Sequence, residues 1–150
     1  MNTQPDDLVR CKEEQRQQWD SVAAGWKKWW RAIENGAQHV SKRMLELAEV
    51  KPGQRVLDIA TGIGEPALLA AGMVGATGSV VATDISPQML DIARERAAAL
   101  GLTNVQFIES GVEGLDFPDG SFDTILCRWG VTSLPSPSNP LVKIRRMLAP

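Results

Sequence analysis

Two carboxylates and two glycines are the residues of this 150-residue chain whose spacing could bind a nucleotide-like ligand. Asp58 lies inside an extended aliphatic run, and Gly62 and Gly64 follow it in the segment Val56–Ala67, which reads VLDIATGIGEPA. Glycine permits backbone conformations and close approaches that a Cβ would block, so this turn can present free N–H groups to a ligand. Asp84 follows a second extended run, where a carboxylate can accept hydrogen bonds from both hydroxyls of a ribose.

The charge of Asp58 indicates which ligand such a turn would accept. A carboxylate in the strand repels a diphosphate and attracts a cationic amino group. S-adenosylmethionine (SAM), with its α-ammonium and its sulfonium, therefore fits better than a dinucleotide. An NAD-binding oxidoreductase domain remains the alternative, because Gly62, Gly64 and Ala67 formally satisfy the pattern GxGxxA and Asp84 supplies its acidic residue.

Hydrophobic patterning predicts the elements that position these residues. Short runs rich in β-branched residues begin near Val56, Val80, Val105 and Ile125, and helical segments lie between the first three. This alternation predicts βαβ units with a parallel sheet, hence an α/β fold. The segment from Pro66 to about Val74 is apolar nearly all round, so it predicts a helix buried against the sheet.

The next helix has clear end signals. Ser86 is expected to be its N-cap, Pro87 its first residue and Gly101 its stop. Its predicted core stripe consists of Met89, Leu90, Ile92, Ala93, Ala97 and Leu100.

Residues 1–50 show helical spacing and no strand pattern, and they predict an N-terminal helical cap on a domain formed by residues 51–150. Glu34–Gly36 predicts a break between two helices of this cap. Trp19, Trp26 and Trp30 fall on one face of a helix, either as a packed stripe or as a lid over the ligand.

Composition sets outer bounds. With 43% apolar residues and a net charge of −2, the sequence predicts one soluble domain with no general attraction to polyanions such as nucleic acid. It has neither an apolar run long enough for a membrane span nor a secretory segment after Met1, so a cytoplasmic location is expected. Cys11 and Cys127 are too few for a disulfide or zinc framework, and no metal site is expected.

Four segments together resemble class I SAM-dependent methyltransferases, in the branch of the ubiquinone/menaquinone C-methyltransferases. They are VLDIATGIGEPA, Asp84–Leu90, Leu115–Asp123 and Cys127–Gly130, within a match from about Gln18 to Pro150. The resemblance implies a Rossmann-like, doubly wound parallel sheet in the family order 3-2-1-4-5-7-6. This sequence contains the 3-2-1-4 half and lacks strands 5 to 7, which suggests a C-terminally truncated member.

The resemblance also implies where SAM binds. The expected cofactor-binding residues are Asp58, Ala60, Thr61, Gly62 and Gly64 in the first segment, Asp84, Ile85 and Met89 in the second, Gly111, Val112 and Glu113 after the third strand, and Arg128 and Trp129 after the fourth. Met89 and Trp129 are equally interpretable as packing residues. Gly111 stands where the family commonly has an Asp that binds the adenine amino group, a contact that Glu113 could replace.

The expected function is methyl transfer from SAM to a small, apolar acceptor. Direct displacement at the methyl carbon requires no acid or base, so no catalytic residue is assigned; His39 and Glu65 are candidates for proton removal. The competing interpretation is a truncated or degenerate SAM-binding module without catalysis. The chain lacks the Asp/Asn-Pro-Pro-aromatic tetrad typical of nucleic-acid amino methyltransferases.

An open sheet edge is the basis for a prediction about assembly. If the chain ends at Pro150, the strand Thr124–Cys127 has no fifth strand beside it, and unpaired edges favour association. A homodimer is therefore expected, with this strand and residues 134–150 at its interface.

Overall fold

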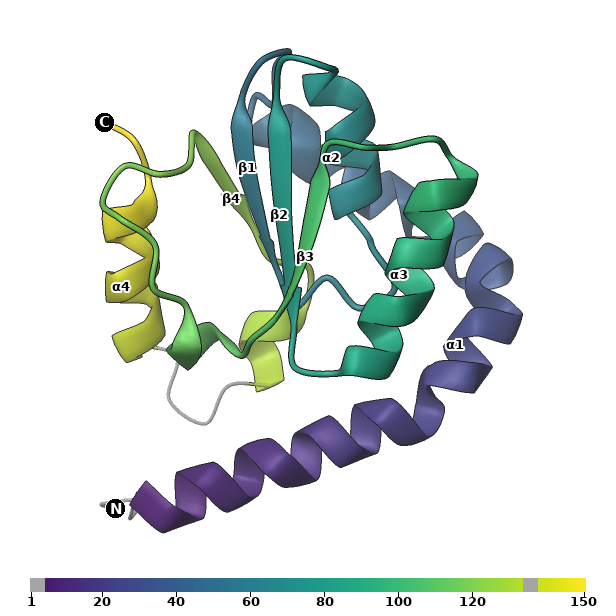
Figure 1. Cartoon of the computed structure of the whole chain (residues 1–150), viewed down its shortest axis with the longest axis vertical. Helices are drawn as coiled ribbons and strands as arrows, with labels where there is room; N and C mark the ends of the chain where they lie inside the picture. Colours follow the sequence, from purple (N-terminus) through teal and green to yellow (C-terminus); the bar gives the residue numbers. More distant parts are fainter. Residues whose placement is uncertain (1–4, 134–137) are drawn as a thin grey trace.

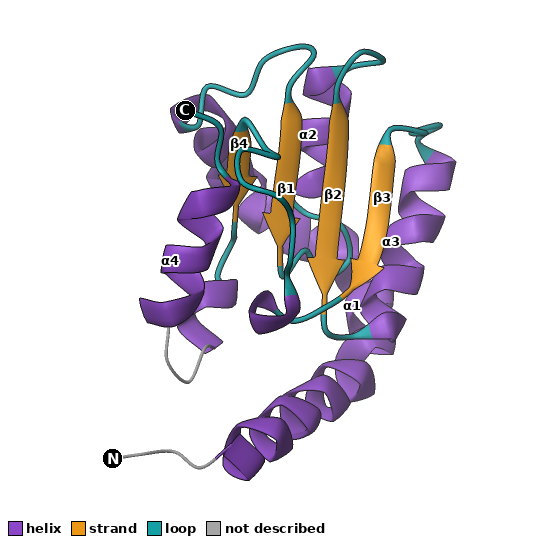
Figure 2. Ribbon diagram, turned by 60° about the vertical axis from the view of Figure 1, so that its left-hand side comes forward, coloured by secondary structure: helices purple, strands orange, loops and turns teal. Residues whose placement is uncertain are grey.

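A computed structural model of the chain describes residues 5–133 and 138–150. Its sheet has four parallel strands, β1 (Arg55–Ile59), β2 (Ser79–Asp84), β3 (Val105–Glu109) and β4 (Thr124–Leu126). Their order is β3-β2-β1-β4 (Figure 1), which confirms the predicted Rossmann-like α/β fold. All four strands end on the same side of the molecule (Figure 2), and parallel α/β sheets bind their ligands at that side.

Helices cover the two faces of the sheet. They are α1 (Pro5–Leu47), α2 (Ala67–Val74), α3 (Pro87–Ala99) and α4 (Ser138–Met147), with short 3-10 turns η1 (Val112–Gly114) and η2 (Gly130–Ser133). The C-terminal half of α1 lies with α2 and α3 on one face, whereas α4 and η1 lie on the other (Figure 2). No helix among the described residues is both long and apolar enough to cross a membrane.

Strand alternation divides the core into two layers. Val56, Val80 and Ala82 are fully buried with Leu45 of α1 and the apolar helix α2. Leu57 and Ile59 point to the opposite face and are buried with Val112, Phe122 and Met147. Asp58 lies two positions after Val56 in β1, so its side chain points to the same face of the sheet. Strand geometry alone therefore places this carboxylate against α2.

The end signals of α3 are confirmed. The Ser86 hydroxyl accepts a hydrogen bond from the Met89 N–H, Pro87 begins the helix, and Gly101 adopts a φ of 67° just beyond its end. Two details differ from the prediction: Leu100 is 63% exposed and not in the core stripe, and α2 begins at Ala67 with Pro66 as its N-cap.

The predicted break at Glu34–Gly36 is wrong, because α1 is one helix of 43 residues. Glu34, Ala37, Ser41 and Leu45 recur at helical spacing and are all buried against the rest of the molecule. A glycine in a helix interior costs only about 1 kcal/mol, and these tertiary contacts outweigh that cost at Gly36. In Figure 1 the helix bends around the domain, so its N-terminal half crosses the side where the strands end.

The edge of β4 is partly paired from within the chain. Phe122 lies just before β4 and forms a parallel bridge with Leu148, which follows α4. The Phe122 N–H donates to the Met147 carbonyl at 2.9 Å, and the Ala149 N–H donates to the Phe122 carbonyl at 2.7 Å. The tail after α4 thus returns to the sheet beside the start of its predicted open edge.

A buried ion pair anchors the C-terminal half of α1. Two Arg128 nitrogens donate to the two Glu34 oxygens at 2.7 and 3.1 Å, and Arg128 also donates to the Ser41 hydroxyl at 2.8 Å. The Arg128 and Glu34 side chains are only 6% and 8% exposed. Since a charge left unpaired at such a site keeps its full desolvation penalty, neither partner tolerates loss of the other.

Glu34→Ala should therefore lower the free energy of unfolding by about 3 to 5 kcal/mol, because it leaves the Arg128 guanidinium buried without its partner. The matched control is Glu46→Ala, which removes an exposed pair with Arg43 on the same helix and should change stability by less than about 0.5 kcal/mol. Urea unfolding followed by circular dichroism measures both values. Equal effects of the two substitutions would show that the buried pair does not anchor α1.

Candidate functional site

A cavity of about 800 Å³ opens where the strands end. It is lined by α1, the glycine turn after β1, the segments after β2, β3 and β4, and α4. Most of the residues expected to bind a cofactor lie on its wall: Ala60, Thr61, Gly62, Asp84, Ile85, Met89, Gly111, Val112, Glu113, Arg128 and Trp129. Asp58 and Gly64 do not line it. Segments far apart in sequence therefore converge on one chamber, which is large enough for a small-molecule ligand.

The turn between β1 and α2 has the close approaches that its glycines suggest. Gly64 has a φ of 105°, and a Cβ there would lie 2.9 Å from a Leu68 methyl carbon, so a larger residue would have a strained backbone and would displace the Leu68 side chain. Gly62 has a φ of 56°, with open space where its Cβ would be. Gly62 thus keeps the cavity floor open, whereas Gly64 has a packing role.

Asp84 holds the turn to the end of β2. Its Oδ2 accepts a hydrogen bond from the Gly62 N–H at 2.8 Å, and its Oδ1 accepts one from the Ser86 N–H at 2.9 Å. The residue is 8% exposed, and burial raises the pKa of its carboxyl while these N–H groups oppose that rise. Each carboxylate oxygen keeps a further lone pair, so Asp84 can still accept two hydroxyl donors from the cavity.

Asp58 lies beneath the turn rather than on the cavity wall. It is completely buried, and its Oδ2 accepts a hydrogen bond from the Ala67 N–H at the start of α2. Burial raises the pKa of this carboxyl to about 7, although the hydrogen bond from the Ala67 N–H and the charge of Arg128 oppose the rise. The carboxylate occupies the helix N-terminus to which a dinucleotide presents its diphosphate, which disfavours that ligand.

Buried polar atoms without protein partners among the described residues lie beneath the glycine turn. Asp58 Oδ1 and the Thr61 hydroxyl are two of them. Buried polar atoms normally have hydrogen-bond partners, so these unpaired atoms favour an ordered water beneath the turn. The open space at Gly62, with the Asp58 charge beneath the turn when that carboxyl is ionised, fits the cationic amino-acid portion of SAM.

Glu113 occupies the space above Gly111. A Cβ at Gly111 would lie 2.8 Å from Glu113 Oε2, 2.9 Å from Lys12 Cε and 3.1 Å from Ile85 Cγ2. A carboxylate therefore lies close to where an acidic side chain at position 111 would begin.

Arg128 and Trp129, in the segment after β4, have different surroundings. Arg128 uses its guanidinium to bind Glu34 and Ser41, with its charged carbon also 4.5 Å from the centre of the Trp129 ring. Trp129 is 53% exposed at the cavity wall, in a left-handed conformation with a φ of 68°. Such a backbone is unusual for a bulky residue and aims its ring differently from an extended chain.

Residues of α1 that were not expected at the site also line the cavity. They are Val9, Lys12 and Gln15, in addition to Trp19 and Trp26 of the tryptophan stripe. Trp30 instead packs against the cluster of Ala23, Ile63, Met89 and Ile92, so the stripe serves both as a cavity wall and as packing. The helical spacing of Lys12, Gln15, Trp19 and Trp26 is the signal that could have identified this face.

The candidates for proton removal are separated by the fold. Glu65 lines the cavity and pairs with Arg96 at 2.8 Å, while its Oε2 is buried without a partner among the described residues. Burial raises the Glu65 pKa, and Arg96 opposes the rise. His39 is exposed on α1 and does not line the cavity. Cys127 lines it as a free thiol whose pKa burial raises to about 11, so it stays protonated near neutral pH.

The chain is similar to known proteins in both sequence and fold. The family model of the methyltransferase domain matches residues 56–150. The ubiquinone/menaquinone biosynthesis C-methyltransferase UbiE of Ectopseudomonas mendocina is 38% identical over 132 residues, 87% of this chain and 52% of that protein. A SAM dependent methyltransferase from Aquifex aeolicus has a TM-score of 0.67 at 31% identity, over 73% of this chain and 58% of that one.

A further structure agrees in fold alone. It is a putative S-adenosyl-L-methionine-dependent methyltransferase from Methanococcus maripaludis, with a TM-score of 0.75 at 20% identity, over 87% of this chain and 59% of that one. The fold and the site thus define an α/β protein of the SAM-binding type. The chain belongs to the class I SAM-dependent methyltransferases, whose cofactor is SAM. It spans about half the length of the first curated relatives it matches.

The raised pKa of Asp58 predicts a pH dependence of stability. In the unfolded chain this carboxyl ionises near pH 4, but in the folded protein it does so near pH 7. The folded state therefore binds the proton more tightly, and its stability is lost as pH rises between these values.

Asp58→Asn removes this titration while keeping an oxygen for the Ala67 N–H. The stability of the variant relative to the wild type should rise by a few kcal/mol from about pH 4 to pH 7 and then level off. Thermal unfolding across this range measures the difference. A difference independent of pH would show that Asp58 is ionised in the folded protein throughout.

Proposed function

We propose that this chain binds SAM in the cavity and supports transfer of its methyl group to a small, apolar acceptor. The observation that carries the proposal is the placement of Asp84 on the cavity wall, where two backbone N–H groups fix its carboxylate beside the glycine turn. Its remaining lone pairs suit the two hydroxyls of a ribose. The family supplies the identity of the nucleoside.

The other residues predicted to bind the cofactor line the cavity on either side of Asp84. Ile85, Gly111 and Val112 form an apolar slot for adenine, with the Glu113 carboxylate positioned to accept from its amino group. On the other side, the turn Ala60–Gly62 lies against the methionine portion, although its Thr61 and Gly62 N–H groups already donate within the chain and are not free for the ligand. Asp58 lies beneath the turn as a negative charge when ionised. Met89 is 2% exposed, so its contribution is to the wall.

The chain would accelerate transfer by positioning and by excluding water. When bound, SAM supplies an electrophilic methyl group, and displacement needs the acceptor held in line with it at about 3 Å. Trp19 and Trp26 cover the cavity from α1, with their ring centres 6.5 Å apart. No protein group is required to move a proton in the displacement itself, and the Glu65 Oε2, which has no partner among the described residues, is buried rather than open to the cavity.

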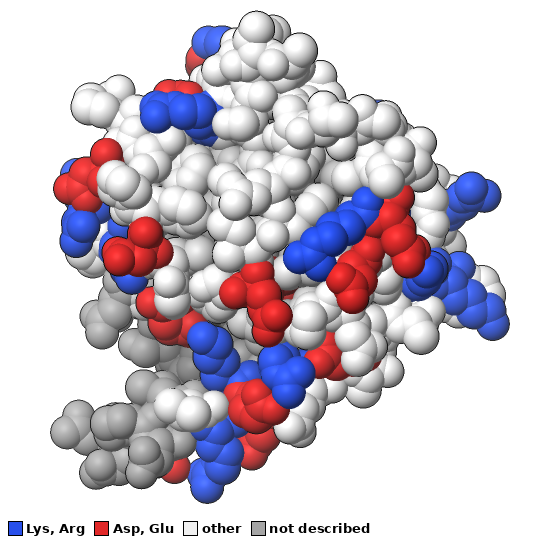
Figure 3. All heavy atoms as spheres, in the orientation of Figure 1, with Lys and Arg blue, Asp and Glu red and all other residues white. Residues whose placement is uncertain are grey.

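The rest of the cavity wall is the basis for the proposed methyl acceptor. Trp129, Val131, Leu141, Ile144 and Leu148 contribute apolar surface away from Asp84. Apolar walls favour an acceptor with little charge. The relatives named as ubiquinone/menaquinone C-methyltransferases make a hydroquinone a suitable probe of this wall. Nucleic acid is a less suitable acceptor, because basic and acidic side chains lie side by side on the face drawn in Figure 3.

Calorimetric titration tests the cofactor site. Wild-type protein should bind SAM and its demethylated product, with no heat from NAD. Asp84→Ala should weaken binding at least tenfold, because it removes the carboxylate acceptor of the ribose. It should also lower stability, since the Gly62 and Ser86 N–H groups lose their acceptor. Glu113→Gln should weaken binding less, by a factor of a few, while preserving the side-chain shape.

The matched control is Asp119→Ala, which removes a carboxylate that pairs with Arg146 on the surface. Its affinity for SAM should equal that of the wild type. An unchanged affinity of Asp84→Ala would contradict the site. Transfer of labelled methyl from SAM to a short-chain hydroquinone distinguishes an enzyme from a degenerate module, which would bind SAM and transfer nothing.

The homodimer and the cytoplasmic location stay proposals. Support for a dimer comes from β4, which is the last strand of the described sheet on its side. The pairing of Phe122 with Leu148 covers only the approach to this strand, and residues 134–137 of the expected interface lie outside the described residues. Sedimentation equilibrium at micromolar concentration should give the mass of two chains; the mass of one would show that β4 is not paired with a second copy.

A further inference from the structure

The N-terminal half of α1 crosses the mouth of the cavity and is fastened on both sides of it. On one side, the Gln15 side-chain amide donates to the Ser133 carbonyl of η2 at 2.8 Å. On the other, the Ser86 hydroxyl donates to Asp20 Oδ1 at 2.6 Å. Ala23 is buried, but Val9, Trp19 and Val22 of this half are 70%, 37% and 41% exposed. Polar contacts therefore have a large share in holding it in place.

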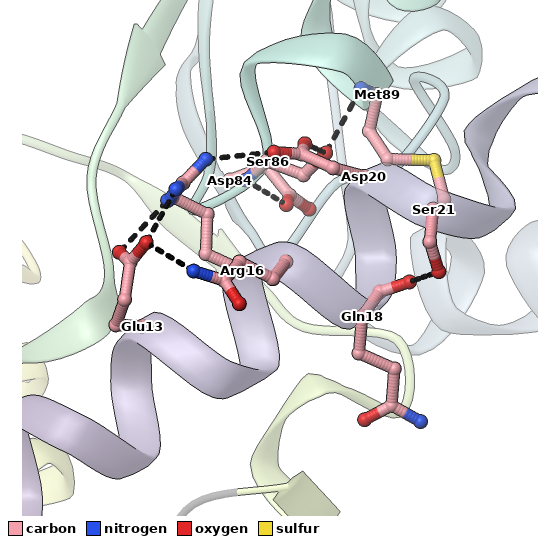
Figure 4. Close-up of polar contacts among 9 residues, drawn as sticks. Glu13, Arg16, Gln18, Asp20, Ser21, Asp84, Ser86 and Met89 are labelled. Atoms are coloured by element: carbon pink, nitrogen blue, oxygen red, sulfur yellow. Dashed lines mark hydrogen bonds and ion pairs between the residues drawn. The ribbon is translucent and has the colours of Figure 1, made fainter.

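Ser86 links this half of α1 directly to the ribose carboxylate. Its N–H donates to Asp84, and its hydroxyl oxygen accepts from the Met89 N–H at the start of α3. A serine hydroxyl has one proton to donate, and here Asp20 receives it. Asp20, Ser86 and Asp84 thus form one continuous chain of hydrogen bonds, drawn in Figure 4.

Asp20 is held in position by α1 itself. Its Oδ2 accepts from an Arg16 nitrogen at 2.7 Å, and Arg16 in turn pairs with Glu13 one turn earlier (Figure 4). The Asp20 side chain is only 12% exposed. After burial, which is the main cause, the charge of Asp20 also raises the pKa of Asp84. The two carboxylates are therefore within electrostatic reach, and Arg16 offsets the repulsion between them.

We propose that Asp20 is a positioning residue that couples occupancy of the cofactor site to docking of the N-terminal half of α1. This inference rests on the proposed binding of SAM at Asp84. The bond from Ser86 to Asp20 holds the junction between β2 and α3, and with it the Asp84 carboxylate, in one arrangement. A ribose bound to Asp84 favours that same arrangement and so favours the docked helix. Such coupling is reciprocal: each event strengthens the other by the same factor.

Titration with the demethylated product of SAM measures the first half of this coupling. Asp20→Ala should weaken binding by about fivefold or more, because coupling free energies of this kind correspond to factors of 5 to 150. Asp20→Asn keeps an oxygen for the Ser86 hydroxyl and should retain most of the affinity. The matched control, Asp7→Ala, removes a carboxylate of the same helix that pairs with exposed Arg10, and should bind as the wild type does.

Hydrogen exchange of residues 5–22 measures the second half. In the wild type, saturation with the demethylated product should slow exchange in this segment, whereas in Asp20→Ala at saturation it should not. A purely structural Asp20 would lower stability and leave both the affinity and the ligand-dependent protection unchanged, which would overturn the proposal. Alanine is the best helix former, so Asp20→Ala should fold.

Arg16→Met provides a second variant that leaves Asp20 intact. It exposes Asp84 to an uncompensated charge and should also weaken binding several-fold. Wild-type affinity in this variant would contradict the part assigned to the Arg16 charge. If the wild type itself shows no heat with SAM or its product, the proposed function fails, and the coupling fails with it. Binding by the wild type that is indifferent to Asp20→Ala refutes the coupling alone.

Discussion

The carboxylate of Asp84 is the interaction on which the arrangement of the site depends. By accepting from the Gly62 and Ser86 N–H groups, it joins the turn after β1 to the start of α3. The turn would otherwise have left-handed residues at Ala60, Gly62 and Gly64 with little to keep them in one conformation. A second tie, from the Thr61 N–H to the Thr83 carbonyl, acts in the same place. The cavity floor is therefore preorganised by the strands beneath it.

Buried charges determine where the long helix lies on this framework. Glu34 with Arg128 and Glu65 with Arg96 are ion pairs with little exposure, and Arg96 also lies 4.3 Å from the centre of the Trp30 ring. Buried pairs add little net stability, but an incorrect position of α1 would separate Glu34 from Arg128 and the Trp30 ring from Arg96. These two contacts thus select one position of α1 over alternatives that apolar packing alone would allow.

Much of the fold could be predicted from the sequence because its signals are local. The strands, the glycine turn and the Ser86 cap each depend on residues within a few positions of one another. The single helix α1 could not, since Glu34 is held by a residue 94 positions away. The direction of Asp58 was misjudged for a related reason: strand alternation places it against α2, whereas its charge suggested contact with the ligand. Asp20 had no local signal, because its partner Ser86 lies 66 positions away.

Different kinds of contact hold the two halves of α1 against the domain, and this difference has consequences for function. A bidentate, desolvated pair holds the C-terminal half, whereas hydrogen bonds from Ser86 and Gln15 hold an N-terminal half whose apolar side chains remain partly in water. Segments with few buried apolar contacts open at lower free energy than the core. Because α1 is continuous, the anchored half keeps the other half near the cavity when its own contacts break. This arrangement would let the proposed cofactor site open without loss of the helix that covers it.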